Sequence, residues 1–522
     1  MGNSRNKSNT LSLFLYEVKG GVVFFFLFLL SVVHPFYVPE KFYYIGTYKL
    51  LFFERVTLVF LAASVFFFIL TIIFLPRSIK IKFETTDVAF LALAGWNIVS
   101  LFLSPYFPDG LLGYETWRMG LLTQLAITAI YFIIKQWANK WKSIITITMI
   151  AFTFENILVI LQRFGKNPLN LYAGMGLGDW NRRNLLGTIG NSNWLCGYMM
   201  CLVPVLIWLY LLEEKRVWNV IWGIMLFISL AALFLQGSSS GVVALAGVLL
   251  VCLCFVIKTY KNLIRLLSIP FMISFFWMML SLFQVELLEP EEVHTPQKVY
   301  SLLWIIPVII LLAVIVILSA WVKKKHKDDL SFSFIRNTII LIAAIIFVGM
   351  LVFTVIQIWG PSSDNGIVQK LIIKDTWGSN RVLLWKETLK HFFGNTPLKS
   401  ILFGVGPDCY GNWFIEQEIY IPAEGPLSEV VYTNAHNLIL TMLVNAGLIG
   451  MLIYLATWGS LLFLFIKKRK ESYFSLLGIL MITGMGINGF FSFQQVCATP
   501  LFYALLGLVR GMTDRKESVQ DK

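Results

Sequence analysis

Residues 56–75 read VTLVFLAASVFFFILTIIFL, an apolar stretch without a charged side chain. A helix of that length is about 30 Å long, which matches the thickness of the hydrocarbon core of a bilayer. The whole chain of 522 residues is 57% hydrophobic and only 14% charged, which is more apolar than a soluble globular protein. The stretch therefore predicts a membrane-spanning helix, and the composition predicts a chain made mostly of such helices.

Similar apolar runs recur along the whole chain. They predict an all-α polytopic integral membrane protein with about 14 transmembrane helices and one large extracytoplasmic loop. Helices 1–11 fall in residues 1–359, the outer loop with a short amphipathic helix in 360–435, helices 12–14 in 436–511, and a cytoplasmic tail in 512–522. The predicted spans are 20–39, 51–76, 87–104, 111–134, 143–162, 189–212, 217–235, 239–258, 263–285, 300–322, 337–359, 436–466, 473–493 and 496–511.

The Lys and Arg residues lie in short clusters between the apolar runs, so the net charge of +13 reflects membrane topology rather than nucleic acid binding. Threading from an inside start places roughly 27 of them inside and roughly 15 outside. The first run follows a basic start without a small-residue cleavage site, which predicts a retained signal anchor and cytoplasmic termini. The last two spans are separated by a very tight turn, and a re-entrant hairpin there is the alternative.

The cysteines give no sign of a disulfide framework or a structural metal, because there is no Cys-x-x-Cys pair and no Cys/His spacing of the zinc type. Only Cys409 lies in a hydrophilic loop, where we expect an impermeant thiol reagent to reach it from outside. Glu155 lies midway along the fifth predicted span and marks either a proton path or a structural hydrogen bond. Gly404-Val405-Gly406 lacks the ending of a phosphate-binding P-loop and predicts a turn.

His436 opens the predicted twelfth span, and Gly447 and Gly450 follow in the same helix. The step from His436 to Gly447 is about three helical turns, so both are expected on one face. The glycines would let a neighbouring helix approach closely. A helix amino terminus disfavours the imidazolium form, so a neutral His436 can act as a general base. The alternative is an interfacial histidine without a chemical role.

Predicted spans four, six, eight and twelve all run from outside to inside, so their amino termini face the exterior. Free helix N–H groups, arginine forks and asparagine amides together make a site for phosphate groups. Arginines that extend to lipid phosphate are the alternative explanation. The residues at or near these termini include Arg118, Arg182, Arg183, Asn191, Asn193 and the run Ser238-Ser239-Ser240-Gly241.

The outer loop is the longest hydrophilic segment, and chemistry is expected there. Ser379 is predicted to cap a short amphipathic helix that continues to about Phe393. Arg381 and Trp385 are four residues apart, which places them on one face of that helix.

Over roughly residues 110–510 the chain resembles the O-antigen ligase and O-antigen polymerase superfamily of bacterial membrane glycosyltransferases. The family pattern of His-Asn, nine residues and Gly-x-x-Gly is met in full, and a loop arginine and a Gly-x-Gly element precede it. One departure is Ser239-Ser240-Gly241, where many members have Ser-Arg-Gly. The matching positions are His436, Asn437, Gly447, Gly450, Arg381 through Trp385, Gly404 through Gly406, and Gly187-Thr-Ile-Gly-Asn-Ser-Asn193.

The resemblance implies transfer of a glycan from a polyprenyl diphosphate carrier to an acceptor hydroxyl at the outer face of the bacterial plasma membrane, without a metal ion or other cofactor. The acceptor is a glycan for a polymerase, a lipid for a ligase, or a protein for an O-oligosaccharyltransferase. A transporter or flippase is the alternative from another class, although the chain lacks the repeated halves common in transporters. The implied roles are proton acceptance by His436, diphosphate binding by Arg381, Arg182, Arg183, Arg118, Asn191 and Asn193, and support by Asn437, Trp385, Gly447 and Gly450.

Overall fold

The computed structural model describes residues 2–76, 83–114, 118–174, 185–256, 259–283, 305–325, 377–421 and 431–515. These residues are mostly helical. The described strands are β1 (Leu185–Leu186) and β2 (Gly190–Asn191), which pair antiparallel around a tight turn. The predicted all-α class is therefore confirmed.

The helices of the first half include two short π-helical segments, η1 and η3. In chain order the elements are α1 (Gly2–Phe28), η1 (Leu29–Val33), α2 (His34–Phe36), α3 (Ile45–Phe74), α4 (Thr85–Leu103), α5 (Phe107–Leu112), α6 (Leu121–Trp137), α7 (Trp141–Arg163), α9 (Ser192–Leu212), α10 (Arg216–Leu235), α11 (Ser239–Val251) and η3 (Cys252–Val256).

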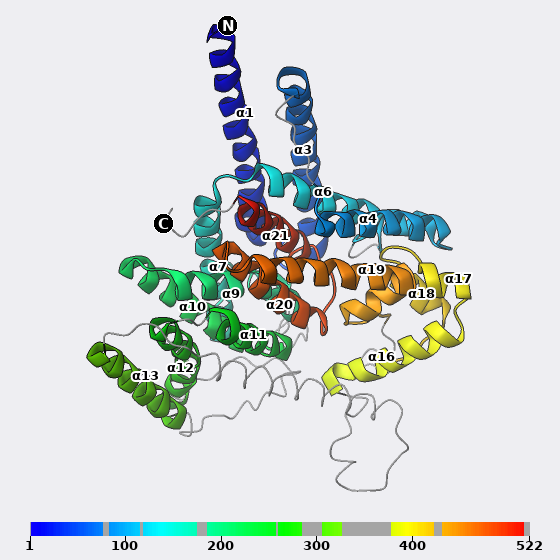
Figure 1. Cartoon of the computed structure of the whole chain (residues 1–522). Helices are drawn as coiled ribbons and strands as arrows, with labels where there is room; N and C mark the ends of the chain where they lie inside the picture. Colours follow the sequence, from blue (N-terminus) through cyan, green and yellow to red (C-terminus); the bar gives the residue numbers. More distant parts are fainter. Residues whose placement is uncertain are drawn as a thin grey trace.

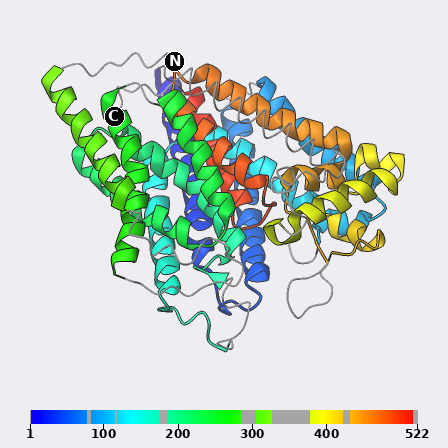
Figure 2. The ribbon, with the colours of Figure 1, turned by 90° about the horizontal axis from the view of Figure 1, so that it is seen from below.

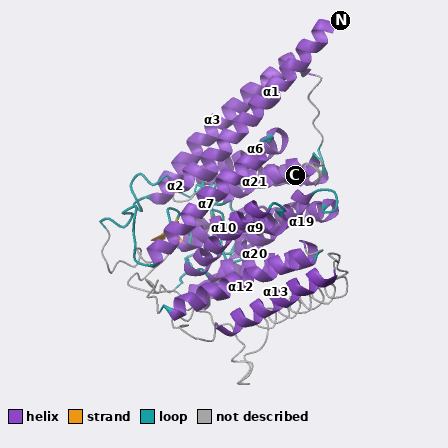
Figure 3. Cartoon of the chain, turned by 90° about the vertical axis from the view of Figure 1, so that its left-hand side faces the viewer, coloured by secondary structure: helices purple, strands orange, loops and turns teal. Residues whose placement is uncertain are grey.

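The second half continues with α12 (Tyr260–Leu282), α13 (Ile305–Lys325), α16 (Trp377–Gly394), α17 (Leu398–Phe403), α18 (Tyr410–Glu416), α19 (Leu438–Lys468), α20 (Tyr473–Gly489) and α21 (Thr499–Asp514). Helices α16, α17 and α18 lie together at one side of the molecule, beside α19 and α4, while α12 and α13 pack against each other at the opposite side (Figures 1 and 2). Helices α1 and α3 pair and extend beyond the other helices (Figures 1 and 3).

Eight of the described helices are long and apolar enough to cross a membrane. Their outward faces carry large apolar side chains, such as Leu58, Val59 and Phe66 of α3, which are exposed in the isolated chain. A lipid environment accommodates such a surface, whereas water does not. The polytopic membrane fold is therefore confirmed. The predicted span at 337–359 lies outside the described residues, so the number of spans stays a prediction.

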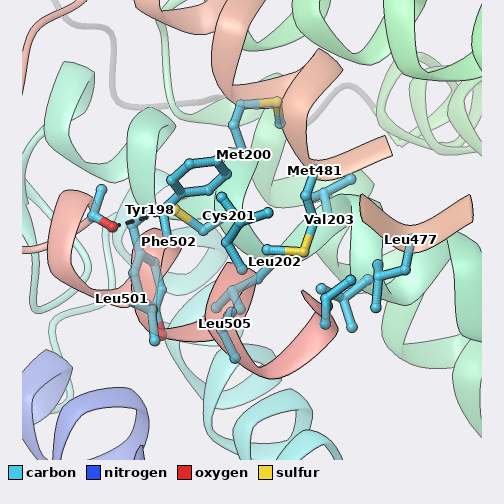
Figure 4. Close-up of a cluster of buried hydrophobic side chains, with 14 of the residues drawn as sticks. Tyr198, Met200, Cys201, Leu202, Val203, Leu477, Met481, Leu501, Phe502 and Leu505 are labelled. Atoms are coloured by element: carbon cyan, nitrogen blue, oxygen red, sulfur yellow. Dashed lines mark hydrogen bonds between the residues drawn. The ribbon is translucent and has the colours of Figure 1, made fainter. Parts of the chain in front are cut away.

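The core is built around α9, which is buried on almost all sides. Helix α20 covers one side of it and α10 another, and α21 packs against α20. Figure 4 shows part of this packing, where Met200 and Cys201 of α9 lie among side chains of α20 and α21 such as Met481 and Leu501. A helix that is apolar all round is expected at the centre of a bundle rather than at its surface.

One end of the bundle, called the site end below, gathers the starts of four helices. Arg381 bonds to Asn193 at the start of α9. Ser240 at the start of α11 bonds to Asn488 near the end of α20. The start of α6 joins the same end through Gln124, which donates to Gln494 in the loop after α20, and the residues before α19 contact that loop too.

The opposite end, called the basic end, is held by ion pairs. Lys468 at the end of α19 lies 2.8 Å from Asp514 of α21 and 3.4 Å from Glu84, which precedes α4. Arg510 donates to Glu84 at 2.5 Å. Helices α6, α9, α11 and α19 therefore start at one common end, as predicted, and α20 and α21 each traverse the bundle between the two ends.

The predicted fourth span, 111–134, is wrong at its start. Helix α5 ends at Leu112, Gly113 and Arg118 have φ angles of +95° and +43°, and the next helix, α6, begins only at Leu121. A left-handed backbone conformation cannot continue a right-handed helix. The apolar side chains at 111–112 belong to a short separate helix.

Candidate active site

His436 lies in a short loop immediately before α19. Asn437 caps this helix, because its Oδ1 accepts hydrogen bonds from the backbone N–H groups of Ile439 (3.0 Å) and Leu440 (3.1 Å). Asn434 Oδ1 accepts the N–H of His436 at 2.9 Å. His436 itself has a φ of +47°. Two asparagine side chains thus fix the left-handed turn that presents the imidazole.

The imidazole of His436 is enclosed by aromatic rings. Its ring meets Phe493 edge-on at 5.2 Å between centroids and Tyr432 at 6.0 Å. Nδ1 is buried and has no hydrogen-bond partner among the described residues. Burial, and then the nearby charge of Arg381, lower the pKa of His436 to about 3. The imidazole is therefore neutral at pH 7, with burial as the larger cause and Arg381 as the smaller one.

Arg381 and Trp385 of α16 both reach toward this loop. Arg381 Nη2 donates to Asn193 Oδ1 at 3.3 Å, and Trp385 Nε1 donates to the backbone carbonyl of Ala435 at 2.8 Å. Asn191 Oδ1 accepts the N–H of Asn193 at 2.8 Å and so caps α9. The predicted common face of Arg381 and Trp385 is confirmed, and it joins α16 to the start of α9 and to the residue before His436.

The first turn of α16 differs from a capped regular helix. Gly378 and Asn380 have positive φ angles of +65° and +64°, so the right-handed helix becomes regular only at about Arg381. The helix starts at Trp377, two residues before the predicted cap at Ser379. Gly378 and Asn380, whose backbone is left-handed, therefore lie within three residues before Arg381 in the chain.

Two side chains of α7 form hydrogen bonds with the turn before α9. Glu155 accepts the N–H and the hydroxyl of Thr188, both at 2.6 Å. Gln162 Oε1 accepts the N–H of Gly187 at 2.5 Å, and its Nε2 donates to the carbonyl of Gly187 at 3.2 Å. Glu155 is fully buried. Of the two explanations for Glu155, the structural hydrogen bond is therefore the one that the geometry supports.

The start of α11, where many family members carry an arginine, is a neutral polar cluster. Ser240 Oγ donates to Asn488 Oδ1 at 3.1 Å and lies 2.8 Å from Ser238 Oγ. Cys196 Sγ lies 3.3 Å from both Ser240 Oγ and Asn488 Oδ1. Neither Asn488 nor Cys196 belongs to a sequence motif, so the sequence did not predict that they lie at the start of α11.

Gly447 interrupts α19 with φ +72° and ψ 178°, so the predicted continuous face from His436 to Gly447 is wrong. A break inside a membrane helix leaves backbone carbonyls that need other donors. Those donors come from α4 and from the Gly404–Gly406 turn. The bonds are Val405 N to Val444 O (3.0 Å), Gly406 N to Asn445 O (2.9 Å), Ser100 Oγ to Asn445 O (3.0 Å) and Trp96 Nε1 to Ala446 O (2.8 Å).

The close approach expected at the glycines is confirmed. A side chain at Gly447 would collide with the backbone of Leu402 and Gly404, and one at Gly450 would collide with the Trp96 ring. Gly404-Val405-Gly406 is a turn, as predicted, and its N–H groups are used by the broken helix rather than left for phosphate. The glycine motifs therefore build the support beneath His436.

Asp408 is a residue of this region that the sequence did not reveal. Its Oδ2 accepts the backbone N–H groups of Tyr114 (3.0 Å) and Met119 (2.9 Å), which fixes the loop before α6. Burial raises its pKa to about 7. Asp408 and Asn434 also line a cavity of about 30 Å³ beside the His436 loop, large enough for water.

Of the three other expected arginines, Arg118 is the one that the structure describes, and it does not join Arg381 and His436. Arg118 lies in the loop before α6, with its guanidinium 4.0 Å from Glu54 of α3. Arg182 and Arg183 lie outside the described residues. Cys409 is fully buried, so the expectation of an accessible thiol in this loop is wrong. It packs behind the Gly406–Pro407 turn although the surrounding sequence is hydrophilic.

No cluster of three or more His, Cys, Asp or Glu side chains suited to a metal ion occurs within the described ranges. The charged group that the structure does place next to His436 is the Arg381 guanidinium. This arrangement can accept a proton at the imidazole and attract an anion at the guanidinium.

Comparison with known proteins places residues 304–455 in a match to the family model described as O-antigen ligase. The matched segment includes Arg381, His436, Gly447 and Gly450. None of the curated proteins compared matches the chain. Together with the polytopic helical fold, this match over less than a third of the chain supports its resemblance to the O-antigen ligase and O-antigen polymerase superfamily of membrane glycosyltransferases.

Proposed function

We propose that this protein transfers a glycan from a polyprenyl diphosphate to an acceptor hydroxyl at the outer face of the plasma membrane, in the synthesis of a cell-surface polysaccharide. The observation that carries the proposal is a neutral imidazole with an unpartnered Nδ1 beside an arginine held at a helix start. A proton acceptor and an anion ligand at one place are what glycan transfer from a diphosphate requires.

In the proposed reaction, the acceptor oxygen attacks the anomeric carbon of the donor, and the bond from that carbon to the diphosphate oxygen breaks. His436 takes the proton of the acceptor hydroxyl. Arg381 offsets the charge that develops on the departing diphosphate, because a guanidinium fork can hold two phosphate oxygens at once. The electron pair of the broken bond leaves with the diphosphate, so the step needs no oxidant or reductant.

Other residues are proposed in supporting roles. Asn193, capped by Asn191, orients Arg381, and Asn437 and Trp385 fix the loop that carries His436. We assign the donor diphosphate to the site end of the bundle, where Arg182 and Arg183 would add charge and Arg118 would contribute only on leaving Glu54. Both termini and the basic end are proposed to face the cytoplasm, and residues 360–435 the exterior.

The proposal is tested with purified protein in liposomes that contain a polyprenyl-diphosphate-linked glycan. We expect formation of a glycosylated acceptor together with release of free polyprenyl diphosphate, when glycan, lipid and protein acceptors are offered separately. The acceptor that is used distinguishes a polymerase, a ligase and an O-oligosaccharyltransferase. Movement of the intact donor across the bilayer without any transfer product would contradict the proposal and favour a flippase.

A further inference from the structure

A second cavity lies at the basic end of the bundle, far from His436. It has a volume of about 260 Å³, compared with about 30 Å³ for the cavity beside the His436 loop. The start of α7, the end of α9, and the starts of α10 and α20 form its walls. Since α9 runs from Asn193 to this cavity, the two sites are about 30 Å apart along the helix. The lining includes Trp141, Lys142, Trp208, Lys215, Trp218, Trp222 and Tyr473.

The walls of this aromatic cavity are rigid paired rings. Trp208 stacks on Tyr473 with 5.5 Å between centroids, and Trp218 stacks on Trp222 at the same separation. Trp208 Nε1 donates to the backbone carbonyl of Tyr473 at 3.1 Å, which fixes that wall. Tryptophan and tyrosine concentrate at the boundary between lipid tails and head groups, because they present an apolar body and a polar tip.

Trp222 is the more deeply buried tryptophan of the Trp218–Trp222 pair in this lining. Its side chain is only 4% exposed, and Nε1 is buried without a hydrogen-bond partner among the described residues. The ring of Trp222 therefore closes the inner wall of the cavity with apolar surface.

The mouth of the cavity carries two cations, Lys142 and Lys215, and one carboxylate, Glu213. The Glu213 carboxylate closes the turn between α9 and α10, where its Oε1 accepts the N–H groups of Glu214 and Lys215, both at 2.9 Å. Lys142 lies with its ammonium 5.4 Å from the centroid of the Trp141 ring. Both lysine side chains are exposed, and the balance of charge at the mouth is positive.

We propose that the aromatic cavity binds one anionic phospholipid of the surrounding membrane. The phosphate lies between Lys142 and Lys215, and an acyl chain enters between the indole rings. The cavity combines an apolar aromatic interior and a positive mouth at interfacial depth, which is the chemistry that such a lipid requires. This site is independent of the proposed glycan transfer.

The test is native mass spectrometry of the purified full chain after exchange into nanodiscs of phosphatidylglycerol, phosphatidylethanolamine or their mixture. We expect one retained phosphatidylglycerol per chain and a clear preference over phosphatidylethanolamine. Lys142→Gln and Lys215→Gln should each lower affinity about fivefold, since one lysine near a lipid phosphate contributes about 1 kcal/mol.

Lys140→Gln is the matched control, because Lys140 lies two residues before Lys142 in the chain but pairs with Glu17 and does not line the cavity. It should retain lipid like the parent protein. Thr146→Phe, which fills the lining, should exclude lipid while leaving helix content and monodispersity unchanged. Equal retention of both lipids, no retention by the parent protein, or unchanged retention in the cavity variants would each overturn the proposal.

Discussion

Arg381 connects the two halves of the proposed site, because it bonds to Asn193 and its charge acts on His436. We predict that Arg381→Lys and Arg381→Ala both weaken donor binding and transfer, by roughly tenfold or more for loss of a charged hydrogen bond. Arg381→Lys keeps the charge but not the planar fork, so it should retain more donor binding than Arg381→Ala but less than the parent protein. The measurement is donor affinity and transfer rate with donors that share the diphosphate but differ in sugar.

Lys390→Ala is the control for that comparison, because Lys390 lies on the same helix, is largely exposed and pairs only locally with Glu387. It should behave like the parent protein. Parent-like donor affinity in both Arg381 variants would rule out arginine recognition of the diphosphate.

Asp408 predicts an effect of pH on stability. Its pKa is about 7 in the folded protein, above the ordinary value of 3.8, because the carboxyl is buried. Between these two values the folded state binds more protons than the unfolded state, so this group contributes stability that is full below about pH 4 and is lost as pH rises through 7.

Asp408→Asn removes the titration but keeps an oxygen for the N–H groups of Tyr114 and Met119. We therefore expect a higher thermal midpoint at pH 8 and a flatter profile between pH 4 and pH 8 than in the parent protein. The measurement is thermal unfolding in detergent across this range. A variant whose profile follows that of the parent protein would show that Asp408 is not the group responsible.

At the scale of one helix, the break in α19 is the feature that positions the loop before it. Gly447 has a backbone conformation that is essentially restricted to glycine, and a side chain would strike the Leu402 and Gly404 backbone. We predict that Gly447→Ala lowers the free energy of unfolding by roughly 2 kcal/mol or more. Thermal unfolding of the purified variant measures this loss.

Gly459 provides a matched comparison in the same helix, since nothing lies within 4 Å of a side chain placed there. Gly459→Ala should be neutral or stabilise the helix by up to about 1 kcal/mol. Equal effects of the two substitutions would mean that the break at Gly447 has no special structural role.

The sequence predicts the helices well where apolar length decides them, as for α3 and α9, and the glycine and histidine motifs indicate the candidate site. It does not predict features that depend on distant partners. The break at Gly447 needs donors from α4 and from the Gly404–Gly406 turn. The roles of Asp408 and Glu155 depend on backbone groups far along the chain, and Cys409 is buried by a tertiary fold that its hydrophilic neighbours hide.

At the scale of the whole molecule, helices start alternately at the site end and at the basic end, and the orientation in the membrane depends on which end faces the exterior. We predict that the site end faces outward. In a chain whose native cysteines are replaced, Lys399→Cys in the first turn of α17 should react with a membrane-impermeant thiol reagent in cells with a permeable outer envelope. Glu214→Cys, at the basic end, should react only after lysis; both positions are exposed. The reverse labelling pattern would invert the proposed topology.

The central claim is that this chain is a glycan transferase whose proton acceptor is His436. The most direct measurement is the single-turnover transfer rate of purified His436→Ala and His436→Gln, beside the parent protein, at saturating donor. Loss of a positioned general base lowers the rate by about 10² to 10⁴, and donor affinity should change little because Arg381 and Asn193 remain. Transfer by both variants at the parent rate, with normal donor binding, would contradict the claim.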